Sequence, residues 1–282
     1  MDRLLFGDNQ FFGVNHMSEE KARAQAMRFR DTHAVIEVID AALDEGIRTF
    51  MCTTHERIGE VCDHMRANPA RYKDYVFYPC MPYAHKYNNA VAELGMLGAL
   101  NKFLPSGGLV QGGMAFLTKD IERVIKLLID AEMKMFEGLN TPVIFLQNVV
   151  VDFLMGLGFK DAFRVFAAHA KERYDAEPGF ITMNLPPLLD LLEDIGIDNP
   201  IVCANINKMA FRMCGGREAY EQAVATRRFR PIAMSVFASG ALPAREALEY
   251  VCRQKAIKSI VFGASSRSNI RQTRQIVQEL DS

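Results

Sequence analysis

The sequence predicts an α/β protein in which a single closed (β/α)8 barrel extends from residue 1 to residue 282. Three observations lead to this fold. Short runs rich in Val, Ile and Phe alternate with longer amphipathic stretches, and the alternation occurs eight times. Each short run is continuously apolar, as expected for parallel strands buried on both faces. The chain length of 282 residues suits one barrel, and no linker or repeat divides it.

The expected strands are residues 4–7, 49–52, 76–80, 143–147, 180–184, 201–205, 232–237 and 259–263. The helix expected at 33–45 carries apolar residues at helical spacing and ends at Gly46, a residue type that often terminates helices. The helix at 186–195 begins with prolines and ends at Gly196. The remaining expected helices are residues 119–139, 159–174, 244–254 and 268–280.

Two segments do not belong to this alternation. The charged stretch at about 17–30 is an insertion between the first strand and the first barrel helix. It is either a solvated helix or a lid, since loops that follow barrel strands cover the active site in this fold. The Gly-rich run at 107–113 contains either a ninth short strand or a loop.

Composition excludes several classes of protein. The chain has 33 Lys and Arg against 34 Asp and Glu, with 49% hydrophobic residues, so neither a disordered chain nor a nucleic-acid binder is expected. The most apolar window, residues 143–159, is interrupted by Gln147, Asn148 and Asp152, so no membrane span is expected. The six Cys show no regular spacing, which favours reduced thiols in a cytoplasmic protein.

Polar side chains follow the expected strands at their carboxyl ends, where active sites of this fold lie. Four of them are amides: Asn9, Gln147, Asn184 and Asn205. Because buried polar groups need partners, their grouping predicts a pocket for a hydroxylated or carbonyl-bearing small molecule. The alternative is that each amide caps the helix that follows it, and for Asn184 we weigh both equally.

His55 and Glu56, after the second strand, are the expected acid/base pair, because a histidine titrates near neutral pH. The alternative for His55 is a surface residue at a helix start. Asp8, after the first strand, is expected to orient His55 or to act as a second carboxylate. Lys86 and Lys208 are candidates to pair with a substrate phosphate or carboxylate.

Cysteine and histidine chemistry is a further alternative. Cys52 and Cys80, at strand ends, are either inert packing or nucleophiles. A zinc site would need His16, His55 or Glu56 to converge with these thiols. No His-x-His or Cys-x-x-Cys spacing is present, so no metal is expected.

Several stretches resemble the aldo-keto reductase superfamily. ITMN at 181–184, followed by LPPLLDLLEDIGIDNPIVCANIN, is similar to the family's fifth and sixth strands. RPIAMSVFASGAL at 230–242 and SIVFGASSRSNIRQ at 259–272 are similar to its seventh and eighth. LLFGDNQFFG and AALDEGIRTFMCTTHERIGEV extend the resemblance through the N-terminal half. The resemblance covers nearly the whole chain and implies an aldo-keto reductase-like TIM barrel.

The family's catalytic residues are absent from the matching positions. Members reduce carbonyls with an Asp, a Tyr, a Lys and a His. Here the Asp position holds Cys52, the Tyr position falls at or near Arg57, the Lys position lies within 79–81, and the His position holds Gln147. Gln cannot donate a titratable proton and Arg does not deprotonate, so the family's usual proton donor is not expected here.

The positions that bind the cofactor in this family resemble its pattern more closely than the catalytic positions do. The family binds the 2′-phosphate of NADPH at the eighth-strand loop and the helix after it. The residues that this resemblance assigns to cofactor binding are Asn184, Ser265, Ser266, Arg267, Asn269 and Arg271. Hydroxyls, guanidinium groups and a helix N-terminus suit an anion. The family's closing Glu-Asn reads Gln272-Thr273, so the expectation of a phosphate is firmer than that of NADPH.

The functional expectation is an oxidoreductase-like enzyme that acts on a small polar or phosphorylated carbonyl compound with NADPH. Its proton-transfer group has moved, and His55 with Glu56 is the expected replacement. Two alternatives stay open: a non-redox lyase or isomerase that uses the same barrel rim, and a non-catalytic binding or regulatory protein that has kept the fold. The expected partner is a small molecule, and the oligomeric state is left open.

Overall fold

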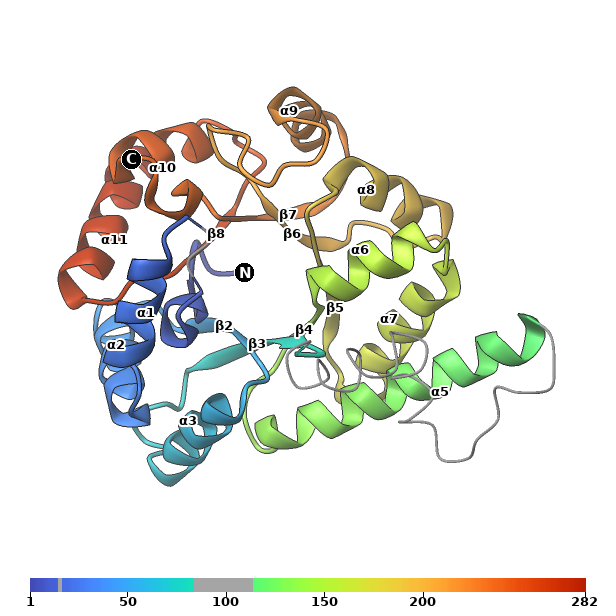
Figure 1. Ribbon diagram of the computed structural model, residues 1–282, viewed down its shortest axis with the longest axis horizontal. Helices are drawn as coiled ribbons and strands as arrows, with labels where there is room; N and C mark the ends of the chain where they lie inside the picture. Colours follow the sequence, from blue (N-terminus) through green and yellow to red (C-terminus); the bar gives the residue numbers. More distant parts are fainter. Residues whose placement is uncertain (15–16, 84–113) are drawn as a thin grey trace.

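The parallel strands of the chain form one closed barrel in the order β1-β2-β3-β4-β5-β6-β7-β8, and β8 pairs with β1. The computed structural model describes residues 1–14, 17–83 and 114–282, and Figure 1 shows the barrel with its helices outside. The predicted (β/α)8 architecture is therefore confirmed. The strands are β1 (Leu4–Gly7), β2 (Thr49–Thr53), β3 (Val76–Met81), β4 (Val143–Leu146), β5 (Glu177–Thr182), β6 (Ile201–Asn205), β7 (Arg230–Met234) and β8 (Ser259–Phe262).

Side chains of each strand point alternately into the barrel and out toward the helices. In β2, Met51 belongs to the cluster inside the barrel, whereas Phe50 and Cys52 belong to the layer between barrel and helices. The interior of the barrel is filled by Leu5, Met51, Tyr78, Cys80, Val143, Phe145, Ile181, Ile201, Cys203 and Ile232. Both faces of the strands are thus apolar, which explains why the strand segments read as continuous apolar runs.

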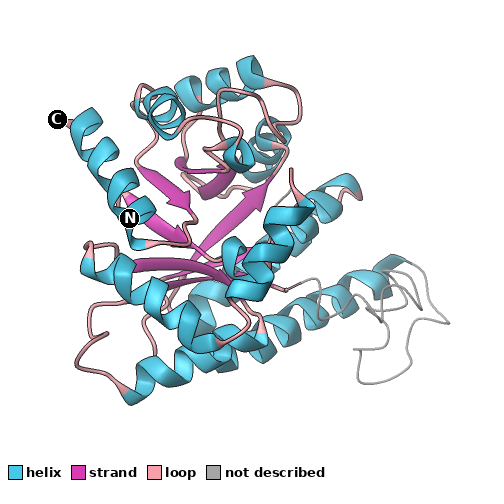
Figure 2. Cartoon of the chain, turned by 60° about the vertical axis from the view of Figure 1, so that its left-hand side comes forward, coloured by secondary structure: helices cyan, strands magenta, loops and turns pink. Residues whose placement is uncertain are grey.

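Helices surround the strands on the outside, as Figure 2 shows. Those predicted from periodicity are α2 (Thr32–Asp44), α5 (Met114–Met133), α7 (Lys160–Tyr174), α8 (Leu185–Asp194), α10 (Ala244–Cys252) and α11 (Arg267–Asp281). The structure adds α1 (Glu19–Arg28), α3 (Glu56–Ala67), α6 (Asn148–Gly156) and α9 (Arg217–Thr226). Short 3-10 turns are η1 (Asn9–Phe12), η2 (Lys134–Phe136) and η3 (Ala238–Gly240). No helix in the described ranges is both long and apolar enough to span a bilayer.

Two strands end two or three residues earlier than the sequence predicts. β5 ends at Thr182 rather than at 184, because the Thr182 hydroxyl accepts a hydrogen bond from the Asn184 N–H at 2.8 Å and turns the chain. β7 ends at Met234 rather than at 237, because Ser235 adopts a φ of 53°. A left-handed residue cannot continue a strand, so the segment after β7 is a loop over the barrel mouth.

The charged insertion predicted at 17–30 contains α1, a helix with no buried residue. It packs on η1 through Gly13, where an added Cβ would lie 2.7 Å from the carbonyl oxygen of Ala22. At the end of α1, the Arg57 guanidinium donates a 2.5 Å hydrogen bond to the carbonyl oxygen of Phe29. These contacts hold α1 beside the carboxyl end of β1. The Gly-rich run at 107–113 lies outside the described residues.

Candidate functional site

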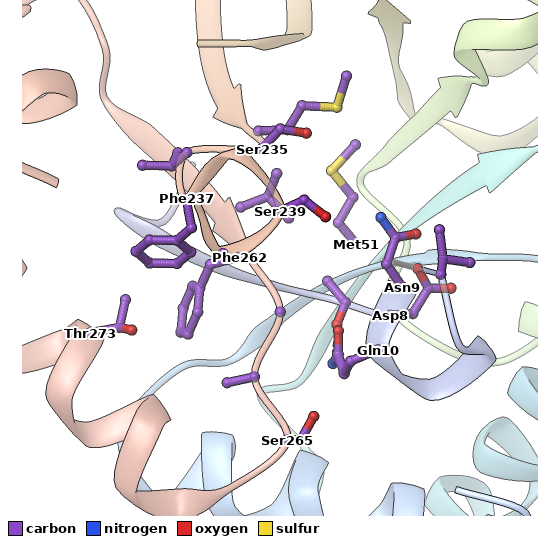
Figure 3. Close-up of a pocket in the computed structure, with 18 of the residues that line it drawn as sticks. Asp8, Asn9, Gln10, Met51, Ser235, Phe237, Ser239, Phe262, Ser265 and Thr273 are labelled. Carbon is purple, nitrogen blue, oxygen red and sulfur yellow. Dashed lines mark hydrogen bonds between the residues drawn. The ribbon is translucent and has the colours of Figure 1, made fainter. Parts of the chain in front are cut away.

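A cavity of about 630 Å³ opens at the carboxyl ends of the barrel strands. Its floor is made by side chains from inside the barrel: Met51, Cys80, Ile181, Cys203 and Met234. Figure 3 shows Asp8, Asn9 and Gln10 on one side of this floor and the loop of Ser235, Phe237 and Ser239 on the other. The volume suits a small-molecule or cofactor site.

Asp8 is buried at the end of β1 and lines this cavity, with 5% of its surface exposed. One carboxylate oxygen accepts hydrogen bonds from the Thr53 N–H and from the Thr53 hydroxyl, both at 2.7 Å. Burial raises the pKa of Asp8 from 3.8 to about 6, although the two hydrogen bonds from Thr53 oppose the rise. A carboxyl with this pKa exchanges its proton close to neutral pH, as an acid/base catalyst must.

Gln10 lies beside Asp8 and is also buried. Its side-chain amide donates a 2.8 Å hydrogen bond to the carbonyl of Gly7, but its Oε1 is buried without a partner. Gly263, at the end of β8, permits this position, because a Cβ there would lie 2.2 Å from Oε1. A buried acceptor without a donor costs about 1–3 kcal/mol, which is typical of a site that a ligand completes.

The loop after β7 forms a strained wall of the cavity. Ser235, Ala238 and Ser239 adopt φ values of 53°, 47° and 60°, in the left-handed region that residues with a Cβ rarely enter. Ser235, Phe237, Ser239 and Gly240 all line the cavity. Backbone strain of this kind costs about 1–3 kcal/mol per residue and is concentrated at ligand clamps and active sites.

The start of α11 supplies the adjoining wall. Ser265 and Asn269, both predicted to bind a cofactor, line the cavity together with Gln272 and Thr273. Ser266 does not belong to the lining, and its hydroxyl caps α11 by accepting a hydrogen bond from the Asn269 N–H at 3.3 Å. This wall therefore presents hydroxyls and amides to the cavity rather than charges.

The two arginines predicted to bind a phosphate lie on a different face of α11. Arg267 pairs with Asp44 at 2.6 Å, and Arg271 pairs with Glu45 at 2.9 Å, both at the C-terminal end of α2. Neither arginine is among the residues that line the cavity. Glu45 is 6% exposed, so its pairing with Arg271 holds a buried carboxylate.

The catalytic residues predicted from sequence are divided by the structure. Asp8 and Gln147 line the cavity, whereas Cys52, His55 and Glu56 do not. Cys52 points outward because it alternates with Met51 along β2, and burial raises the pKa of its thiol well above the ordinary value. A fully buried thiol with a raised pKa is a poor nucleophile.

His55 is the N-cap of α3, where its Nδ1 accepts a hydrogen bond from the Arg57 N–H at 3.0 Å. Its ring stacks on Phe12 at 4.2 Å and meets the edge of Tyr83 at 5.5 Å. Glu56 is exposed in the first turn of α3. The structure therefore places both at the helix start that the alternative interpretation described, and their catalytic roles stay predictions.

The amides predicted to form a polar pocket have different surroundings. Asn9 and Gln147 line the cavity. Asn205 donates a 2.9 Å hydrogen bond to the carbonyl oxygen of Arg212 and organises the loop after β6. Asn184 precedes α8 without a side-chain cap and is absent from the cavity lining, so its cofactor role stays a prediction.

Lys208 pairs with Glu246 at 2.7 Å, which leaves it engaged at the surface. Lys86 and His16 lie outside the described residues. Within the described part of the chain, no group of three or more His, Cys, Asp and Glu residues is arranged to hold a metal ion.

The sequence pattern assigns no individual role to Thr53, Gln10, Lys21 or Gln25, all of which line the cavity. Thr53 follows Cys52 in β2, so one of these two side chains must point into the barrel and the other out of it. Because both faces of the strand are buried, the sequence pattern does not show which of the two points inward. Lys21 and Gln25 belong to α1, and their four-residue spacing places them on one helix face.

No family model matches the sequence, and no curated protein matches it. Solved structures do match nearly the whole chain. A protein from Pseudomonas aeruginosa, provisionally described as an aldo-keto reductase, is 15% identical, covers 99% of this chain and 90% of its own, and has a TM-score of 0.61. Aldose reductase from Giardia lamblia is 12% identical, covers 98% of this chain and 87% of its own, and has a TM-score of 0.58.

A third structure, provisionally described as a 2,5-diketo-D-gluconic acid reductase B, is 10% identical. It covers 98% of this chain and 85% of its own, with a TM-score of 0.55. At these identities the similarity shows the fold. The chain is a closed (β/α)8 barrel, and its fold is similar to that of these reductases, as the sequence motifs predict.

Proposed function

We propose that this protein is an oxidoreductase that reduces the carbonyl group of a small polar compound, or oxidises the corresponding alcohol, in the cavity at the barrel mouth. The observation that carries the proposal is Asp8, a carboxyl with a pKa of about 6 in the wall of a cavity of about 630 Å³. Asp8 takes the role of proton donor and acceptor that sequence reasoning gave first to His55 with Glu56.

Asp8 is suited to both directions of the reaction. Near its pKa of about 6 a substantial fraction of the carboxyl is protonated, so it can deliver a proton to the oxygen of a carbonyl that is being reduced. In its ionised form it can take the proton from an alcohol. Thr53 fixes one carboxylate oxygen through two hydrogen bonds, and the backbone N–H of Asp8 itself also favours the ionised carboxyl. In this proposal the substrate oxygen binds at the second carboxylate oxygen, since Asp8 lines the cavity.

The residues of the β7–β8 side fit a nicotinamide dinucleotide. Ser265, Asn269 and Thr273 offer hydrogen-bonding groups to it, and the strained loop at 235–240 supplies close backbone contact. When bound, such a cofactor supplies the hydride that carbonyl reduction requires. Selection of NADPH over NADH would depend on groups at the start of α11 that bind the additional phosphate. The two arginines there, Arg267 and Arg271, pair with Asp44 and Glu45.

Nucleotide binding is the first test. NADPH, NADP⁺ and NADH are titrated against the wild-type protein, and binding is followed by nucleotide fluorescence and by thermal shift. The proposal predicts saturable binding that weakens in Ser265→Ala. A second series measures turnover of polar and phosphorylated aldehydes and ketones with Asp8→Asn, which keeps the shape of the side chain but cannot donate a carboxylic proton. We expect at least about a hundredfold loss in kcat, typical of losing an acid/base group.

The control is His55→Asn, which keeps a side chain able to cap α3. It should retain turnover if Asp8 is the proton donor. Loss of turnover in His55→Asn together with normal turnover in Asp8→Asn would reverse the assignment. Activity without any nucleotide binding would instead favour the lyase or isomerase alternative, in which Asp8 acts as a base.

A further inference from the structure

The helix α1 has contacts that fix it over one side of the cavity. It packs on η1, the turn that directly follows Asp8. The close approach at Gly13 is to Ala22 and Ala26 in the body of the helix, and the hydrogen bond from Arg57 to the carbonyl of Phe29 holds its C-terminal end. Lys21 and Gln25, one helical turn apart, line the cavity from this helix. The insertion therefore contributes to the site rather than only to the surface.

Charge is scarce in this cavity. Among the described residues that line it, Asp8 and Lys21 are the only two with a carboxyl or a cationic side chain. Other cations near the mouth are engaged, since Lys208 pairs with Glu246 and Arg267 pairs with Asp44. Within the described ranges, no carboxylate pairs with Lys21 and no hydrogen bond involves its ammonium group. One uncompensated cation thus faces a cavity that holds one carboxyl.

The stability of α1 does not explain a lysine at this position. Ser18 caps the helix by accepting a 3.2 Å hydrogen bond from the Lys21 N–H, which makes Lys21 the third residue of the first turn. The partial positive charge of a helix N-terminus disfavours a cation there and favours acids such as Glu19 and Glu20. Lys21 is exposed and lines the cavity, so a role toward an anionic ligand in the cavity accounts for a cation that the helix N-terminus disfavours.

Two unpartnered oxygens accompany this cation. Gln25 Oε1 and Gln10 Oε1 are both buried without a hydrogen-bond donor, and both residues line the cavity. Gln10 is 5% exposed, so its amide cannot rely on bulk water. Acceptors of this kind suit a ligand that carries donors such as hydroxyl groups.

We infer that Lys21 is a specificity-determining residue that binds the anionic group of the substrate, a phosphate or carboxylate on a polyhydroxylated carbonyl compound. The inference rests on the proposed function and adds the substrate class to it. The substrate is favoured over the cofactor as the source of the anion, because α1 packs on the turn next to Asp8. The surfaces proposed for the nucleotide belong instead to the loop at 235–240 and to α11.

Binding measurements test this without turnover. D-ribose 5-phosphate and D-ribose, and D-gluconate and D-glucose, are titrated by calorimetry against wild type and Lys21→Met. The matched control is Arg23→Met, since Arg23 is on the same helix but pairs with Glu19 at 3.2 Å on the exposed face. We expect ribose 5-phosphate or gluconate to bind wild type and to bind Lys21→Met about tenfold or more weakly. The neutral sugars should bind both variants equally, and Arg23→Met should match wild type.

Each other outcome overturns the assignment. Equal affinity of wild type and Lys21→Met for the anionic sugars, or no saturable binding of either anionic sugar to wild type, removes Lys21 from substrate recognition. Weaker NADP⁺ binding in Lys21→Met with unchanged ribose 5-phosphate binding assigns the cation to the cofactor phosphates instead. Failure of the proposed redox function alone would appear as an absence of nucleotide binding, with the contrast between anionic and neutral sugars preserved.

Discussion

Asp8 and Thr53 join the ends of β1 and β2, with a single carboxylate oxygen of Asp8 accepting both the N–H and the hydroxyl of Thr53 at 2.7 Å. This arrangement holds an ionisable group inside the barrel mouth, where burial works against its charge. The pKa of about 6 is the balance between burial, which raises it, and the two hydrogen bonds, which lower it.

Burial makes Asp8 a source of pH-dependent instability. Because the folded pKa of about 6 exceeds the ordinary value of 3.8, folding favours the protonated form, and the free energy of unfolding falls as pH rises from about 4 through about 6. The full difference corresponds to about 3 kcal/mol. Asp8→Asn cannot ionise, so we expect it to be more stable than wild type by about 1–3 kcal/mol at pH 7.

Denaturant unfolding from pH 4 to pH 8 measures this directly. The stability of Asp8→Asn relative to wild type should decrease toward pH 4, where Asp8 is protonated in the folded state and partly protonated in the unfolded state as well. A difference that does not change with pH would contradict the raised pKa of Asp8. A gain in stability combined with a loss of turnover would identify Asp8 as a residue kept for function.

The Thr53 hydroxyl sets part of the pKa of Asp8. In Thr53→Val one hydrogen bond to the carboxylate is removed while the backbone N–H remains, so the pKa of Asp8 should rise further, by about one unit. Thr53→Ser retains the hydroxyl and serves as the control. Titration of the Asp8 carboxyl by ¹³C NMR in the three proteins tests this, and identical pKa values in wild type and Thr53→Val would show that the hydroxyl has no such effect.

The Arg271–Glu45 pair is expected to act on stability rather than on the cavity. Glu45 is 6% exposed, so Arg271→Met leaves a buried carboxylate with weaker compensation from Arg274. We expect a loss of about 1 kcal/mol in the free energy of unfolding, since Arg271 itself is half-exposed. Nucleotide affinity should stay within about twofold of wild type. A larger loss of affinity without loss of stability would support the cofactor role predicted from the sequence.

Gly179 in β5 provides a test of the barrel interior. A Cβ at this position would lie 2.3 Å from the Phe145 ring, which fills the space inside the barrel. Gly179→Ala should therefore destabilise the protein by about 1–3 kcal/mol through overpacking. Gly59→Ala, where an added Cβ meets nothing within 4 Å, is the control and should be neutral or stabilising. Wild-type stability of Gly179→Ala would show that Phe145 does not occupy the space beside β5.

The barrel could be predicted from the sequence because its signal is local and repeated. Each strand is an apolar run, and helices such as α8 and α11 have clear apolar faces and recognisable ends. Strand ends were harder to predict. The end of β7 depends on the left-handed backbone of Ser235, and serine is not a residue type that predicts this conformation.

The sequence could place the candidate site only at the rim formed by the carboxyl ends of the strands. Asp8, Gln147, Ser265 and Asn269 follow predicted strands and do line the cavity. The outward direction of Cys52 depends on register, which an apolar strand conceals because both of its faces are buried. The ion pair between Arg267 and Asp44 joins residues 223 positions apart, and a reading of local motifs cannot detect that partner.

The central claim is that Asp8 exchanges the proton during carbonyl reduction, and its most direct test is the pH dependence of kcat/KM for wild type and Thr53→Val. Reduction should fall as pH rises through about 6 in wild type, because the proton donor ionises, and the midpoint should move to higher pH in Thr53→Val. A profile that is flat across this range, or a midpoint unchanged in Thr53→Val, would contradict the assignment of Asp8.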